Sequence, residues 1–228
     1  RGDKYRKQLA REELWRGQHL LRLPAELESG TYRWMLYAYP ESALVAPSGR
    51  EEPVLAPLPE GGEGLGRGLL MQALRINAPE RRWSAPPLDV AVDAHLGEIA
   101  TLLGARIVPA PDGAPLSPTE TLSMTLVWRA ESETPVSYRV FLHLLGPDGA
   151  LVAQADGIPA DWARPTTGWL PGEIVLDPRT LRLPEDAPTG TYRLQAGMYT
   201  LETGRLRTLD GGDAVLLAEF VMQAQNNK

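Results

Sequence analysis

One pattern constrains the fold of this chain more than any other, because it occurs twice. Residues 21–33 and residues 181–193 both begin with Leu-Arg-Leu-Pro and both end with Gly-Thr-Tyr-Arg, with the same spacing between the two tetrapeptides. Proline and glycine between two alternating runs are typical of a corner that joins the end of one β-strand to the start of the next. The repeat therefore predicts two related β-units in tandem.

The composition favours many short strands. The sequence of 228 residues holds 21 Pro and 22 Gly, and 43% of its residues are hydrophobic. Frequent proline opposes long helices, and the apolar content is sufficient for a packed core. We expect an all-β protein of tandem antiparallel β-sandwich units, immunoglobulin-like or jelly-roll-like. A stretch with two arginines and two prolines at residues 80–87 predicts the boundary between a truncated first unit, residues 1–82, and a complete sandwich, residues 83–228.

Charge and cysteine content exclude several classes of function. The formal net charge is −6, and no cluster of Lys and Arg follows residues 1–7, so no nucleic-acid partner is expected. The absence of cysteine excludes thiol catalysis, disulfides and zinc sites built on thiolates. No run reaches about 18 consecutive apolar residues, the length that predicts a membrane-spanning helix. The sequence begins without Met, and we expect it to be a piece of a longer protein.

Residues 138–157 carry the clearest hairpin signal, with Gly-Pro-Asp-Gly at residues 146–149 as the turn. A loop of Pro147 and Asp148 predicts four cross-strand pairs: Leu145 with Ala150, His143 with Val152, Phe141 with Gln154, and Arg139 with Asp156. The opposite face is apolar throughout: Tyr138, Val140, Leu142, Leu144, Leu151, Ala153 and Ala155. Because apolar burial is worth roughly 25 cal/mol per Å², we expect that face to meet the core.

Alternation predicts further strands along the second unit. Leu122, Met124, Leu126 and Trp128 share one face of a run at residues 122–129. Strands are also expected at residues 191–199 and 215–222. Shorter strand pieces are expected on both sides of Gly104 and of the pair Asp177 and Pro178. Among the tryptophans, Trp34 and Trp128 are expected to fill cores.

The repeat has a consequence for the first unit. Residues 69–76 correspond to about residues 215–221, but nothing before Trp15 corresponds to the hairpin at residues 138–157. The first unit therefore lacks the front half of its sandwich, either because that half lies outside this sequence or because the natural unit is a half sandwich. An open sheet with a bare apolar face aggregates. We therefore expect close contact between the two units, or a homodimer.

The second unit resembles a known family along about 135 residues. The resemblance is carried by a series of segments: residues 88–97, 103–104, 122–128, 140–145, 152–157, 165–173, 183–184 and 190–192. Together they resemble the repeated extracytoplasmic β-domains that follow the membrane-spanning part of family 39-like bacterial glycosyltransferases. The resemblance implies a place outside the cytoplasmic membrane and an accessory role beside the membrane domain of the same polypeptide. It implies no catalytic residue, because the family's transferase chemistry belongs to the membrane part.

One polar face could bind a ligand. Arg139, His143, Gln154 and Asp156 share a face of the predicted hairpin, with Phe141 between them, and Trp169 is expected in the loop nearby. Ring stacking and side chains that bind hydroxyl groups are the means of binding a sugar, so a glycan is an expected partner. The alternative is a structural cross-strand pair of Arg139 with Asp156, worth about 0.2–1 kcal/mol, beside a packed His143.

No other residues indicate a cofactor, a metal or catalysis. The three histidines, His19, His95 and His143, have no metal-ligand spacing, and the carboxylates of Asp89, Asp93 and Glu98 fit no known calcium loop. Three functions stay open, in this order: a non-catalytic accessory module that binds glycan or positions a partner, a purely structural or oligomerising sandwich, and a stand-alone glycoside-active hydrolase. A pair of carboxylates in a cleft, about 5–9 Å apart, would favour the hydrolase.

Overall fold

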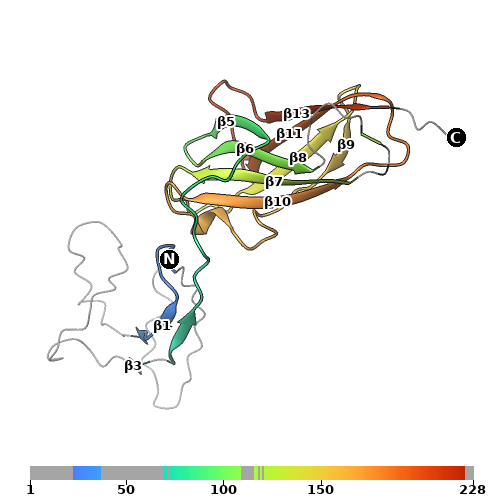
Figure 1. Cartoon of the computed structure of the whole chain (residues 1–228). Helices are drawn as coiled ribbons and strands as arrows, with labels where there is room; N and C mark the ends of the chain where they lie inside the picture. The colour runs from blue at the N-terminus through green and yellow to red at the C-terminus, as the bar shows by residue number, and fades with distance from the viewer. Residues whose placement is uncertain are drawn as a thin grey trace, which may run out of the picture.

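The structure, a computed structural model, describes residues 23–36, 69–70, 72–108, 116–117, 119 and 121–223. Apart from a 3₁₀ turn at Thr166–Gly168, the regular structure within these ranges is β-strand, and every strand pairing is antiparallel (Figure 1). The all-β prediction is therefore confirmed. Within the same ranges, no helix has the length and apolar character needed to cross a membrane.

Two sheets form the sandwich. The first has the strand order β10-β7-β6-β5, with β5 at Val90–Leu96, β6 at Ala100–Val108, β7 at Thr121–Ala130 and β10 at Ile174–Arg182. The second has the order β12-β11-β8-β9, and β13 also pairs with β11. Its strands are β8 at Arg139–Leu145, β9 at Leu151–Gln154, β11 at Gly190–Thr200, β12 at Gly204–Arg205 and β13 at Val215–Met222.

The topology is that of an immunoglobulin-like sandwich. The chain crosses from β7 to β8 in the other sheet, returns as β10 beside β7, and crosses again to β11 beside β8. These are the Greek-key connections of that fold. Leu116 adds a parallel bridge to Met222 at the edge of β13. A tyrosine whose hydroxyl closes the corner before β11 is a second hallmark of the fold: Tyr192 donates to the carbonyl of Pro188 over 2.7 Å.

Every second side chain along the strands points inward and fills the core between the two sheets. Leu122, Met124, Leu126 and Trp128 of β7 are all buried in it, as their alternation predicts. From the second sheet β8 contributes Val140, Leu142 and Leu144, and β11 contributes Tyr192, Leu194, Ala196 and Met198. The apolar inner faces therefore decide which side of each strand remains for solvent.

Two strands are longer than the sequence indicates. β6 runs through Gly104, which lies at a bulge with φ +152° and approaches the β5 backbone so closely that a Cβ would lie 2.0 Å from the carbonyl oxygen of Val90. The predicted hinge at Gly104 is thus a β-bulge. β10 runs through Asp177 and Pro178. Proline, which lacks an N–H, is tolerated there because β10 is an edge strand of its sheet.

The predicted register of the hairpin is wrong by two residues at His143 and by one at Leu145, which pairs with Leu151 instead of Ala150. His143 pairs with Gln154 rather than Val152, and the register shifts again between Leu144 and Leu145. The reason is a larger loop: the amide of Gly146 donates to the carbonyl of Ala150, and Gly149 adopts φ +81°. A left-handed glycine here forms a bulge and lengthens the turn. A shift of two keeps each side chain on its face, although Leu151 at the strand start is 48% exposed instead of buried.

The first copy of the repeated pattern folds into the same corner as the second. Tyr32 donates its hydroxyl to the carbonyl of Glu28 over 2.9 Å, four residues upstream, as Tyr192 does to Pro188. β1 (Gly30–Tyr32) pairs with β4 (Leu74–Ile76), and the pair of Gly30 with Ile76 corresponds to that of Gly190 with Met222. β2 (Met35–Leu36) pairs with β3 (Leu69–Leu70).

Residues 1–22, 37–68 and 71 of the predicted first unit lie outside the described residues, so the tandem arrangement of sandwiches stays a prediction. Trp34 is 39% exposed, and its indole N–H donates to the carbonyl of Gln72 over 2.8 Å. The prediction that it fills a core is wrong, whereas Trp128 is fully buried as predicted. Trp34 lies between β1 and β2 and outside both strands.

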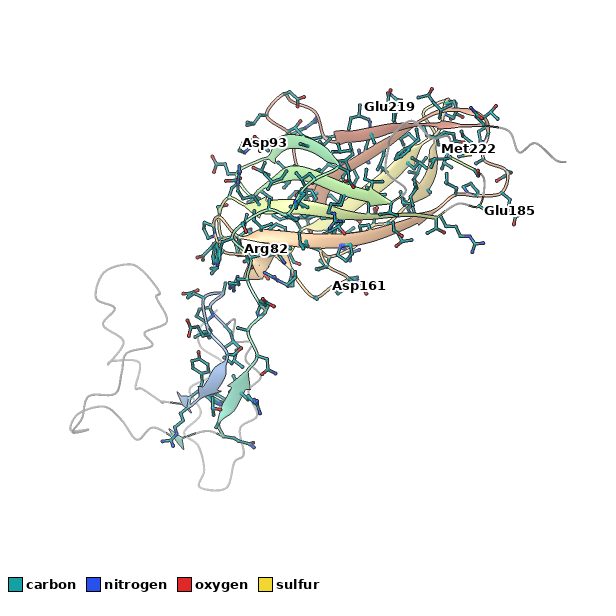
Figure 2. All side chains as sticks on the ribbon, viewed as in Figure 1. Arg82, Asp93, Asp161, Glu185, Glu219 and Met222 are labelled. Atoms are coloured by element: carbon teal, nitrogen blue, oxygen red, sulfur yellow. The ribbon has the colours of Figure 1, made fainter. Side chains whose placement is uncertain are left out.

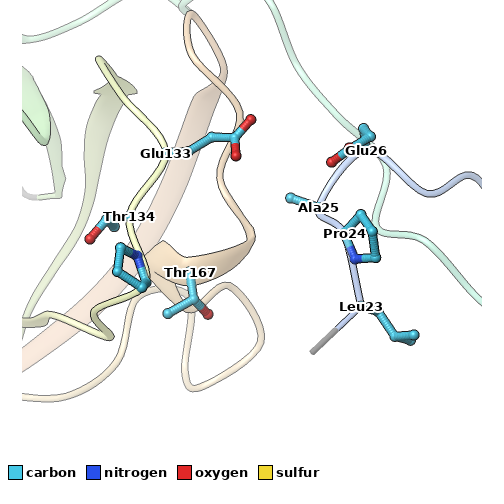
Figure 3. Close-up of a pocket in the computed structure, with 8 residues that line it drawn as sticks. Leu23, Pro24, Ala25, Glu26, Glu133, Thr134 and Thr167 are labelled. Atoms are coloured by element: carbon cyan, nitrogen blue, oxygen red, sulfur yellow. The ribbon is translucent and has the colours of Figure 1, made fainter. Parts of the chain in front are cut away.

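Charged side chains join the first corner to the sandwich. Glu173, which is fully buried, forms ion pairs with Arg81 of the linker and with Arg164. The Arg81 guanidinium also donates to the carbonyl oxygen of Ala25, and the Arg82 backbone pairs with Ile174 at the edge of β10. Beside this junction is an open cavity of about 390 Å³ (Figure 3), lined by Leu23, Pro24, Ala25, Glu26, Glu133, Thr134, Pro135 and Thr167.

We predict that Tyr192→Phe lowers the free energy of unfolding of the sandwich by about 1 kcal/mol, the net worth of a typical hydrogen bond. Tyr32→Phe is the matched control, because it removes the equivalent bond from a partly exposed corner. It should leave the main urea transition unchanged. Equal effects of both substitutions on that transition, or no effect of Tyr192→Phe, would contradict this account of the corner.

Candidate functional site

The outer face of the second sheet brings together four of the five predicted site residues. Because β8 buries every second side chain, Arg139, Phe141 and His143 all point to the outer face. His143 pairs with Gln154 of β9, and the bridge between Val140 and Gly157 places Asp156 opposite Phe141. Arg139, His143, Gln154 and Asp156 therefore share one face, which we call the β8 outer face.

Phe141 forms the floor of this face. Its side chain is 1% exposed although it points away from the core. The Arg205 guanidinium lies 4.2 Å from the ring centroid, and the ring centroids of His143 and Tyr199 lie at 4.8 and 6.4 Å. Gly197 of β11 makes room for the ring, since a Cβ there would lie 2.5 Å from two of its carbons. An aromatic floor under polar groups is thus built into the sheet.

A chain of polar groups crosses the floor. A guanidinium only donates, so Nδ1 of His143 accepts from Nη2 of Arg205 at 3.4 Å and Nε2 of a neutral ring carries the hydrogen. Nε2 lies 3.3 Å from Oδ1 of Asp156 but forms no hydrogen bond with it, which leaves this buried atom without one. The Tyr199 hydroxyl lies 3.5 Å from the other oxygen of Asp156. Nε2 is out of reach of a ligand, whereas the exposed carboxylate of Asp156 and the partly exposed Tyr199 hydroxyl can bind one.

The alternative structural pair of Arg139 with Asp156 does not form: within the described residues the carboxylate contacts His143 and Tyr199. Arg139 instead places its Cζ atom 5.7 Å from the ring centroid of Trp162. No carboxylate is recorded within 4 Å of this guanidinium in the described part of the chain. Arg139 is therefore a cation next to an aromatic ring at one end of the β8 outer face.

Trp169 is not part of the site. It is 1% exposed, belongs to the core, and its indole N–H donates to the carbonyl of Arg164 over 2.9 Å. The tryptophan of that loop which reaches the β8 outer face is Trp162, which is 63% exposed and which sequence reasoning missed. The loop has no hydrophobic period, so the sequence carries no signal that separates a packed ring from a displayed one.

A second polar cluster covers part of the first sheet. Oγ1 of Thr101 lies 3.0 Å from Nδ1 of His95 and donates to Glu131, which also accepts from Nε of Arg129 over 2.8 Å. Burial alone would raise the pKa of Glu131, but the bonds from Thr101 and Arg129 and the Arg129 charge hold it below its usual value. These side chains satisfy one another, so we read the cluster as structural.

The carboxylates considered for calcium have other partners. Oδ2 of Asp89 accepts the amide of Ile107 at 2.8 Å, and Asp93, at φ +49°, lies 3.9 Å from Arg129. Among the described residues, no group of three or more His, Asp or Glu side chains is placed to hold a metal ion.

We predict that Gly197→Ala destabilises the sandwich by about 1–3 kcal/mol, as overpacking typically does, because the added methyl group displaces the Phe141 ring. Urea unfolding measures the change. Gly168→Ala is the matched control, because a Cβ at Gly168 meets nothing within 4 Å. A Gly197→Ala protein as stable as the control would show that Phe141 does not fill this space.

Comparisons with known proteins add little to this description. No family model matches the chain, and no curated protein matches it. Among solved structures, the crystal structure of the C-terminal domain of Wzt aligns with 61% of this chain and 83% of its own length, at 11% identity and a TM-score of 0.35. A likeness at that score carries no argument about ligand or partner.

Proposed function

We propose that this chain is a non-catalytic, extracytoplasmic accessory domain of a membrane glycosyltransferase-like protein, and that it binds glycan on the β8 outer face. The observation that carries the proposal is the row of accessible polar groups on this face, Gln154, Asp156 and the Tyr199 hydroxyl, beside the exposed ring of Trp162. A sugar offers both matching surfaces, since its C–H face is apolar and its hydroxyl groups both donate and accept. The resemblance of the second unit to domains beside such transferases supports the cellular context.

The charges at the centre of this face favour a ligand with hydroxyl groups over a strongly charged ligand. Arg205 lies 3.5 Å from Asp213, so its charge is compensated. Asp156 offers two acceptor oxygens to hydroxyl hydrogens, and Gln154 is an exposed amide that both donates and accepts. Such shallow polar faces bind sugars through several weak bonds rather than through one deep pocket.

The test is a glycan array with the wild-type chain, followed by calorimetry on the best ligand. Asp156→Asn keeps the shape but replaces one acceptor oxygen by a donor, and His143→Ala removes the ring. Each should weaken binding about tenfold, which equals a loss of about 1.4 kcal/mol. Arg106→Gln, on an exposed side chain of β6, is the control and should bind as the wild type does. A wild-type chain that binds no glycan would remove this proposal.

A second candidate function, a purely structural spacer, is favoured by the junction. Glu173 is fully buried between Arg81 and Arg164, and Arg81 also binds the carbonyl of Ala25. Linkers between domains usually permit motion. A buried carboxylate with two guanidinium partners instead fixes the linker against the sandwich, as a spacer requires.

We predict that Arg81→Gln frees the linker and destabilises the sandwich by about 1–3 kcal/mol, the worth of hydrogen bonds to a charged group. Limited proteolysis should then cut within residues 77–88 faster than in the wild type. Arg82→Gln is the matched control, because Arg82 contacts the sandwich through its backbone. Equal cleavage rates for both variants would argue against the spacer.

A further inference from the structure

The loop between β9 and β10 holds an unusual backbone. Ala160, Asp161 and Trp162 have φ values of +52°, +49° and +71°, so three consecutive residues with side chains adopt the left-handed region. This region costs about 1–2 kcal/mol for each such residue and is normally visited by single residues. Backbone strain of this kind persists only where the surroundings enforce it, and it gathers at functional sites.

A buried ion pair on β10 enforces this conformation. Oδ1 of Asp177 accepts the amide of Ala160 at 2.8 Å and binds Nε of Arg179 at 2.9 Å. The Arg179 guanidinium donates in turn to the carbonyls of Gly157 and Ile158, at 3.1 and 3.3 Å. The side chains of Asp177 and Arg179 are 0% and 8% exposed. The loop is thus fixed to the interior of the sandwich immediately before the left-handed turn.

The result of this arrangement is an exposed ring. Trp162 is 63% exposed, while Trp128 and Trp169 are at most 1% exposed. Figure 2 shows Asp161, its neighbour, on the loop that projects from the β10 edge of the sandwich. Packing does not explain the strain, because a ring that serves packing is buried. The contact recorded for the Trp162 ring is the Arg139 guanidinium.

We propose that Trp162 and Arg139 select an acidic glycan at this end of the β8 outer face. The Trp162 ring stacks on the C–H face of a hexuronic acid residue, and Arg139 pairs with its carboxylate. This inference rests on the proposed glycan binding and names its ligand class. An indole is the best of the aromatic platforms, and a guanidinium binds a carboxylate through two parallel hydrogen bonds.

Charge supports the assignment to Arg139. The chain carries a formal net charge of −6, so its overall field does not attract a polyanion. Selection of an acidic sugar must therefore come from a local cation without a carboxylate neighbour. On the β8 outer face Arg205 is compensated by Asp213, whereas Arg139 has the ring of Trp162 as its recorded partner.

The test compares each acidic polymer with its uncharged form. The probes are polygalacturonate, alginate and hyaluronate, each also after chemical reduction of its carboxyl groups, with affinity gel electrophoresis as the assay. For at least one acidic polymer, Trp162→Ala should weaken binding of both forms at least tenfold. Arg139→Gln should weaken binding of the acidic form about tenfold and leave the reduced form unchanged.

Two controls match these variants. Trp83→Ala removes a ring that is 59% exposed in the linker, and Arg182→Gln removes an exposed cation from β10; both should bind within twofold of the wild type. Full affinity of Trp162→Ala, or equal losses of Arg139→Gln on both forms, would overturn the inference while glycan binding stands. A wild-type chain that binds the reduced polymers more tightly than the acidic ones would also overturn the inference while glycan binding stands. Absence of binding to any glycan would overturn the proposed function itself.

The positioning role of Arg179 has a separate readout. Arg179→Lys keeps the charge but cannot reach two carbonyls and Asp177 together. If Arg179 acts by holding Trp162, the double variant Arg179→Lys/Trp162→Ala should bind no more weakly than Trp162→Ala alone. Additive losses would show that Arg179 affects binding by another route, and a folded single variant with wild-type affinity would exclude the role.

Discussion

Burial of alternate side chains between two sheets is the constraint on which the rest of this structure depends. β8 sends Val140, Leu142 and Leu144 inward, and the same backbone must then send the residues between them outward. The outer face is therefore determined by the core without taking part in it. Phe141 is the exception, because it points outward and is nevertheless buried, and Gly197 on the neighbouring strand leaves the space for it. An aromatic ring kept outside the core at the cost of a glycine in a central strand is a feature of a surface rather than of a core.

The sequence predicts those features of the fold that depend on the chemistry of neighbouring side chains along a strand. Alternation of apolar and polar residues predicts the buried face of Leu122–Trp128 and the strands β11 and β13. It also predicts that Arg139 and His143 share one face. The register of β8 with β9 does not follow from this alternation, because it depends on the left-handed Gly149 and its bulge. β5 was not predicted, and its regular pairing is interrupted by a bulge between Ala91 and Ala94, where Asp93 adopts φ +49°. Trp162 was missed because tertiary contacts, and no local pattern, decide which loop tryptophan is covered.

The two copies of the corner separate local from tertiary effects. Tyr32 and Tyr192 make the same hydrogen bond to a carbonyl four residues upstream, although Tyr192 is fully buried and Tyr32 is only partly covered. The shared bond indicates that the corner is specified by its own residues. Its contribution to stability differs for the same reason, because water competes for the exposed bond and not for the buried one.

The pair of Asp177 and Arg179 is hard to explain by stability alone. Burial raises the pKa of Asp177, although Arg179 and the Ala160 amide oppose the shift. A raised pKa means that this carboxyl group stabilises the fold most at acid pH, and that its ionisation as the pH rises costs folding free energy. Apolar side chains in place of a buried ion pair are often neutral or stabilising. The pair is thus retained at a cost, and it holds a strained turn that also costs free energy. Both features fix the short segment that displays Trp162, and a loop that merely connected β9 to β10 would need neither.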